Sequence, residues 1–193
     1  MRQVHRAGEK TFVDYSGKKP AIFDQVTGER IEVELFVAVL GASNYTFAEA
    51  TRTQRSQDWI ESHVRLLEHI GGVPRAIVPD QLKSGVVIAS RYDPGLQRTY
   101  EELAQHYDTT ILPARPAHPR DKAKVENGVL LAQRWILARL RNGRFFSLAE
   151  LNQAIHDLVG QLNDRPMRGW DTSRRALYEP LDRLALRPLP AVP

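Results

Sequence analysis

Three acidic residues lie where a carboxylate needs a special reason. Asp14 lies inside the apolar run 11–15, and Asp80 ends a second run, 76–80. Glu126 lies among cations near the start of a predicted helix. A buried carboxylate is costly without a partner, and several brought together repel one another unless a cation lies between them. The trio therefore predicts a divalent-metal site for phosphoryl transfer on nucleic acid.

Oxygen ligands of this kind suit Mg²⁺ or Mn²⁺. Mg²⁺ is usually held by one or two carboxylates together with phosphate oxygens of the substrate. Two ions about 3.5–4 Å apart clamp the attacking and leaving oxygens of an in-line displacement. We therefore expect two ions when DNA is bound.

Each acid also has an ordinary interpretation. Asp14 fits an edge-strand aspartate that faces solvent, Asp80 fits a turn or cap, and Glu126 fits a surface glutamate of a helix. Aspartate and glutamate make up 23 of the 193 residues, so a trio of acids selected by spacing alone would be common. The choice between these interpretations depends on the scaffold.

The pattern of apolar residues predicts that scaffold. The runs of β-branched and apolar residues predict strands, and the apolar residues at helical spacing between them predict helices. The predicted order is strands 10–16, 31–40 and 45–50, a helix with Ser56 as its N-cap, strand 75–78, helix 94–107, strand 109–112 and helix 121–141.

This order predicts an α/β protein with a ribonuclease H-like fold, in which helices flank a five-stranded mixed sheet. The first strand of that order is central and lies beside the fourth. Asp14 and Asp80 are then neighbours at one end of the sheet, and Glu126 lies on a helix packed against that end. All three acids of the proposed site would meet there.

Composition shifts divide the chain into four predicted parts. Residues 1–9 form a flexible segment, 10–142 the ribonuclease H-like core, 143–186 a helical extension and 187–193 a linker or tail. Within the extension, Ser147 is expected to cap a helix, with a glutamate three residues later as in a capping box.

The charge distribution suits a polyanionic partner. The net charge is +4, and the pI is about 9.5. Basic residues gather along the helix that carries Glu126, and we expect them to contact DNA phosphates, although such a stripe also fits a solvated helix face. The candidates are Lys122, Lys124, Arg134, Arg139 and Arg141.

Several classes of protein are excluded by composition. The chain has no cysteine, which rules out disulfide scaffolds and thiol catalysis. The longest apolar run, residues 35–40, is far short of the roughly 20 residues of a membrane span. The first residues lack the apolar centre of a signal peptide.

Three segments resemble the catalytic core of IstA-type transposases, which are DDE enzymes of the retroviral-integrase superfamily. They are FVDYSG at 12–17, VPDQLKSGV at 78–86 and HPRDKAKVE at 118–126. Segments 162–166 and 183–190 are also similar to that family, so the resemblance covers nearly the whole chain. It implies that Asp14, Asp80 and Glu126 are the catalytic metal ligands.

The resemblance also implies a reaction and partners. Water attacks the phosphodiester at the transposon end and frees a 3′-hydroxyl, which then attacks target DNA without a covalent enzyme intermediate. The implied partners are both DNAs, further copies of the chain and the AAA+ ATPase IstB, in the bacterial cytoplasm. The family's full-length enzymes add an N-terminal helix-turn-helix region and a C-terminal β-domain, so this chain is expected to be an isolated core.

Two rival functions remain open. One is a non-catalytic DNA-binding or assembly module with the same fold, in which the acids are idle. The other is a ribonuclease H-type hydrolase, which would cleave RNA–DNA hybrids. A divalent-metal titration separates the enzyme from the module, because only the enzyme's metal binding depends on the three acids.

Overall fold

The computed structural model describes residues 5–79, 94–112 and 119–192, with side chains from 98 and from 127 onward in the last two ranges. Its centre is a five-stranded sheet in the order β5-β4-β1-β6-β7. The strands are β1 (Lys10–Tyr15), β4 (Glu34–Leu40), β5 (Thr46–Thr51), β6 (Ala76–Pro79) and β7 (Thr110–Ile111).

The first strand is central, as the sequence predicts. β1 pairs antiparallel with β4, where Asp14 is opposite Val37. On its other side β1 pairs parallel with β6, where Val13 is opposite Pro79. The mixed sheet with its central first strand confirms the predicted fold.

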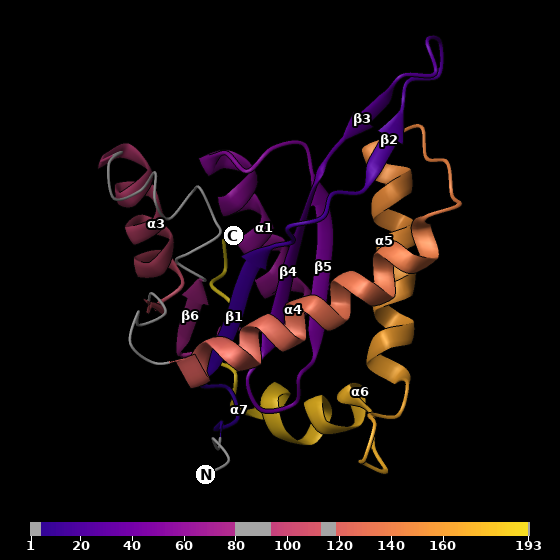
Figure 1. The fold of residues 1–193 in the computed structure, drawn as a ribbon. Helices are drawn as coiled ribbons and strands as arrows, with labels where there is room; N and C mark the ends of the chain where they lie inside the picture. Colours follow the sequence, from indigo (N-terminus) through magenta and orange to yellow (C-terminus); the bar gives the residue numbers. More distant parts are fainter. Residues whose placement is uncertain (1–4, 80–93, 113–118, 193) are drawn as a thin grey trace.

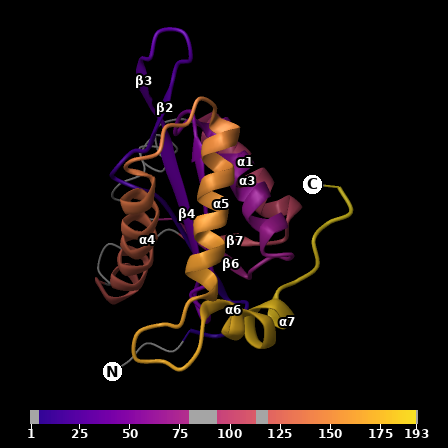
Figure 2. The same cartoon turned by 90° about the vertical axis from the view of Figure 1, so that its right-hand side faces the viewer.

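Alternation along β1 divides the core between the two faces of the sheet. Val13 and Tyr15 belong to the apolar cluster that α1 (Ser56–His69) and α3 (Pro94–His106) cover. Phe12 belongs to the opposite cluster, covered by α4 (Pro119–Leu140) and α5 (Leu148–Asp164). Figure 2 shows α4 on one side of the sheet and α1 and α3 on the other. Because both faces are covered, β4 is buried along its whole length and reads as an unbroken apolar run after Glu34.

Helix α4 (Pro119–Leu140) crosses the sheet obliquely, and α5 (Leu148–Asp164) runs along β5 (Figure 1). Gly128 allows a close approach of α4, because a Cβ at this position would lie 3.1 Å from Cγ2 of Val39. As predicted, Ser147 caps α5, and its hydroxyl oxygen accepts a hydrogen bond from the Glu150 backbone N–H at 3.0 Å.

The C-terminal helices join both ends of the chain to the sheet. Asp182 is 1% exposed and accepts backbone hydrogen bonds from Gly8 at 2.8 Å and Ser43 at 2.9 Å. Arg187 and Val73 exchange two backbone hydrogen bonds. This region consists of α6 (Arg174–Leu177), the π-helix η1 (Tyr178–Asp182) and α7 (Arg183–Ala185).

Two local predictions are corrected. The predicted strand 31–40 is split, because Arg30–Glu32 is exposed and pairs as β3 with β2 (Ala21–Phe23) in a separate hairpin. That hairpin projects beyond the main sheet (Figure 1). The N-cap of α1 is Arg55 rather than Ser56. The preceding turn is instead held by the Asp58 carboxylate, which accepts a hydrogen bond from the Thr53 backbone N–H at 2.8 Å.

Candidate active site

Asp14 is a buried carboxylate on the central strand. It is the fifth residue of β1 and is 4% exposed. The interpretation as a solvent-facing aspartate of an edge strand is therefore wrong, because hydrogen-bonded strands flank β1 on both sides. Strand pairing on both sides fixes the backbone of Asp14. A catalytic or metal site requires ligands that are held in place in this way.

The end of β6 lies beside Asp14. The last residue of β6, Pro79, is opposite Val13 in the parallel register, one position before Asp14. Asp80 follows Pro79 directly in the chain but lies outside the described residues. The described register therefore places the strand that precedes the second predicted acid beside the strand that carries the first.

Asp14 lies on the face of the sheet that α4 covers. Successive side chains of a strand point to opposite faces, so Asp14 shares a face with Phe12. Phe12 packs in the same cluster as Val129 of α4. The backbone at position 126 belongs to α4, one helical turn before Val129, whereas the Glu126 side chain lies outside the described part.

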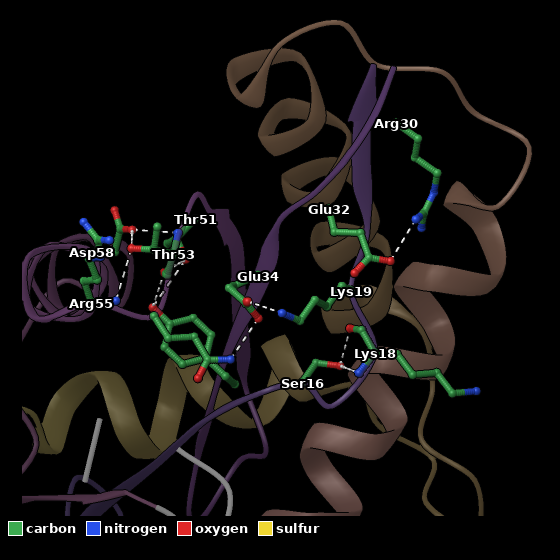
Figure 3. Close-up of polar contacts among 12 residues, drawn as sticks. Ser16, Lys18, Lys19, Arg30, Glu32, Glu34, Thr51, Thr53, Arg55 and Asp58 are labelled. Carbon is green, nitrogen blue, oxygen red and sulfur yellow. Dashed lines mark hydrogen bonds and ion pairs between the residues drawn. The ribbon is translucent and has the colours of Figure 1, made fainter. Parts of the chain in front are cut away.

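Beyond Asp14, the chain enters a loop with two lysines that is fixed by hydrogen bonds (Figure 3). The Ser16 hydroxyl donates to the Lys18 carbonyl at 2.9 Å. Glu34, only 8% exposed, binds Lys19 Nζ through Oε1 at 2.5 Å and accepts from Gln54 Nε2 at 2.8 Å. In the sequence, only the position of this lysine pair just after the strand of Asp14 could have pointed to it.

Tyr15 anchors the opposite face of the strand. Its hydroxyl donates to the Thr53 carbonyl at 3.4 Å and accepts from Thr51 Oγ1 at 3.3 Å. Burial raises the pKa of Tyr15 well above its usual value, so the phenol stays neutral. Tyr15 therefore serves the scaffold and supplies no charge.

The predicted DNA-contacting arginines do not form one stripe. Arg134 of α4 and Arg141, the residue just after its end, are exposed and seven residues apart, so they lie on the same side of the helix. Arg139 lies about 140° round the helix from Arg134. Its guanidinium carbon is 3.2 Å from the centroid of the Trp135 ring, and Trp135 itself donates to the Leu158 carbonyl at 2.8 Å. The side chains of the two predicted lysines, Lys122 and Lys124, lie outside the described part.

The described residues contain one member of the predicted trio with its side chain. Within residues 5–79, 98–112 and 127–192, no three His, Cys, Asp or Glu residues lie close enough to hold a metal. In the same part of the chain, no helix has the length and apolar character needed to cross a membrane.

The fold is that of retroviral integrase catalytic cores. The HTLV-2 integrase catalytic core domain, solved in complex with magnesium, superposes with a TM-score of 0.62 over 92% of this chain and 100% of that one, at 13% identity. The simian T-cell lymphotropic virus intasome, solved with a regulatory subunit of PP2A, gives a TM-score of 0.65 over 99% of this chain and 61% of the matched chain, at 15% identity.

Sequence similarity gives a narrower assignment. The chain is 53% identical over 98% of its length to a putative transposase for insertion sequence IS408 of Burkholderia multivorans, and covers 37% of that protein. It is 28% identical over 86% of its length to the transposase of insertion sequence IS21 of Pseudomonas aeruginosa, and covers 42% of it. No protein-family profile matches the chain.

The chain is therefore a homologue of bacterial insertion-sequence transposases with the fold of an integrase catalytic core. The resemblance predicted from the sequence is confirmed. The chain spans well under half of the length of these curated relatives, 37% and 42% of the two named.

Proposed function

We propose that the chain is the catalytic core of a DDE-type DNA transposase. In this proposal Asp14, Asp80 and Glu126 hold the divalent metal for hydrolysis at the transposon 3′ ends and for strand transfer into target DNA. The observation that carries the proposal is the place of Asp14, a buried carboxylate on the central strand, beside the strand that leads to Asp80 and facing the helix that contains position 126.

The donor set fits a hard divalent cation. All three proposed ligands are carboxylates, and Mg²⁺ or Mn²⁺ prefers such oxygen ligands. The HTLV-2 core, which shares this fold, was solved with magnesium, in agreement with the same dependence here. When bound, such ions neutralise phosphate charge and lower the pKa of the attacking hydroxyl or water.

The contribution of the protein itself is positioning. Pairing with β4 and β6 fixes Asp14 along the sheet, and the next residue, Tyr15, is hydrogen-bonded to Thr51 on the opposite face. In the first proposed step a water oxygen bonds to phosphorus as the 3′-oxygen leaves with a proton. In the second, the new 3′-hydroxyl attacks a target phosphodiester and displaces one 3′-oxygen of the target strand. Alignment and charge stabilisation supply most of the rate in such reactions.

The wider assembly is part of the same proposal. We infer that the complete enzyme acts on DNA as a homo-oligomer in the bacterial cytoplasm, because two transposon ends must be joined together. An AAA+ helper of the IstB type is the partner that the transposase resemblance implies. The core alone implies neither the homo-oligomer nor the IstB-type helper. Both can be tested by co-purification with the full-length enzyme.

The decisive experiment replaces Asp14 in the full-length transposase. Asp14→Asn keeps the size of the side chain and removes one charge, so we expect strand transfer to fall by about 10²–10³-fold, as when one electrostatic group of an active site is lost. Asp171→Asn, at an exposed site between α5 and α6, is the matched control and should retain normal activity. Thermal unfolding of both variants checks the fold.

The outcomes separate the proposed enzyme from its rival. Normal strand transfer by Asp14→Asn would remove Asp14 from the metal site. DNA binding by the core that is indifferent to Mg²⁺, together with unchanged transposition when each of the three acids is replaced, would favour the non-catalytic module. Loss of activity in Asp14→Asn alone, with its melting temperature kept, supports the proposed function.

A further inference from the structure

A groove lies between the β2–β3 hairpin and the C-terminal end of α4. Its volume is about 360 Å³. The floor is apolar and includes Leu137 and Leu140 of α4 together with Phe145. Cationic side chains surround it, and they come from segments more than 100 residues apart. They are Lys18, Lys19, Arg30 and Arg141.

The groove is built on a fixed frame. The Phe23 backbone N–H of β2 donates to the Phe145 carbonyl at 2.8 Å, which ties the hairpin to the link between α4 and α5. At the base of the hairpin, Val33 N–H donates to the Pro20 carbonyl at 3.0 Å, and Ile22 is buried in the core. Figure 1 shows the hairpin beside that link. The walls therefore exist before any ligand arrives, which lowers the cost of binding.

Acids neutralise only part of the cationic rim. Lys19 is paired with Glu34, and Arg30 with Glu32 at 2.8 Å (Figure 3). Lys18 and Arg141 are exposed, and no ion pair joins either of them to an acid among the residues that the structure describes. The groove therefore keeps two cations for an outside anion, one on each wall.

The groove is close to Asp14 along the chain. Lys18 lies four positions after Asp14, and an extended chain of that length spans at most about 14 Å. Duplex DNA rises about 3.4 Å per base pair, so this distance corresponds to roughly four base pairs. A duplex whose scissile phosphate lies at Asp14 therefore reaches the groove within a few base pairs.

We propose that this groove binds the sugar-phosphate backbone of duplex DNA next to the reacting phosphodiester, with Lys18 and Arg141 on phosphates and the apolar floor against deoxyribose. The position relative to the scissile bond rests on the proposed function, whereas the binding itself does not. Contacts of this kind hold the duplex in register without reading its sequence. Arg141 was expected from the sequence as a phosphate contact of α4, and the hairpin lysine opposite it is new.

Salt-dependent binding tests the groove directly. The 193-residue chain is titrated against a fluorescent DNA duplex of random sequence, in EDTA, over a series of salt concentrations. Each phosphate contact contributes about 0.9 to the slope of log K against log salt. The double variant Lys18→Gln/Arg141→Gln should therefore lower the slope by about 1.8, and weaken binding about 60-fold at about 0.1 M salt.

A matched double variant controls for net charge. Arg168→Gln/Arg183→Gln removes the same two charges from exposed positions of the C-terminal region, at the other end of the molecule from the hairpin (Figure 1). We expect its slope to stay close to that of the unchanged chain. An equal loss in both variants would show only the effect of total charge and would overturn the groove.

The proposal can fail separately from the proposed function. If Asp14→Asn abolishes strand transfer while the groove variant binds DNA with an unchanged slope, the groove assignment is wrong and the active site stands. If the groove variant loses slope while Asp14→Asn keeps activity, the groove stands and the site is wrong. Equal effects of the groove variant on duplex DNA and on a dextran sulfate competitor would also overturn it, because the groove would then bind any polyanion.

Discussion

Replacing Asn163 by alanine should destabilise the protein through the edge of its sheet. β5 is an outer strand, and α5 runs alongside it. The Asn163 amide accepts from the Thr46 backbone N–H at 2.9 Å and donates to the Thr46 carbonyl at 2.8 Å. Asn152, eleven residues earlier on α5, makes the same pair of contacts with Ala50, at 2.6 and 2.9 Å. Two side-chain amides thus take the place of a further strand.

The magnitude follows from burial. Asn163 is 1% exposed, so truncation leaves a buried backbone N–H and a buried C=O without their partner. An unsatisfied buried group costs about 1–3 kcal/mol, which gives about 3 kcal/mol for the two once partial relaxation is allowed. For a domain of this size, that corresponds to a fall in melting temperature of roughly 6–12 °C. Asn152 is half-buried, so water can replace its amide and the cost should be about 1 kcal/mol.

Urea unfolding followed by circular dichroism measures these differences. Gln153→Ala is the control, because Gln153 is exposed on the same helix and bonds only to Asp157 among the described residues. It should change the free energy of unfolding by less than about 0.5 kcal/mol. Equal, small costs for Asn163→Ala and Gln153→Ala would refute the idea that the amide stabilises the sheet edge.

Two further predictions concern buried ionisable groups. Burial lowers the pKa of His63 to about 4. The unfolded chain, with a histidine pKa of about 6.5, therefore binds more protons between these values, and stability should fall by up to about 3 kcal/mol as the pH drops through this range. Between about pH 7 and pH 4.5, His63→Gln should lose about 2 kcal/mol less unfolding free energy than the unchanged protein. An equal loss in both proteins would contradict this role of His63. Asp182→Ala removes the acceptor of two buried backbone N–H groups and should cost about 3 kcal/mol in the same unfolding experiment. A cost below about 0.5 kcal/mol would show that the C-terminal helices are not held through Asp182.

Much of the fold could be predicted from local pattern. Residues 10–15 alternate between two apolar faces, and the helices carry apolar residues on the sides that meet the sheet. The capping residue Ser147 was also predictable, because its partner lies only three positions away. In all these cases the deciding interaction joins residues that are close in the sequence, or it depends on a pattern that repeats with a fixed period.

The candidate site was predictable only in part. Motif similarity selected Asp14, and the strand order placed it beside β6, but pattern alone left an exposed edge strand as an open alternative. The strand 31–40 was wrongly predicted as continuous, because apolar content does not show the break at Val33 between β3, which pairs with β2, and β4. Lys18 carried no sign of its proximity to Arg141.

The sequence by itself determined which residues must be buried and the order of strands and helices, and it predicted the carboxylates for a metal site. The tertiary structure alone decided that Asp14 lies in the interior of the sheet, that Asn163 closes the sheet edge, and that Lys18 and Arg141 border one groove. The physical reason is that side-chain patterns encode the preference of each residue for water or for the core. Which distant segments become neighbours depends on how all the helices and strands pack together at once.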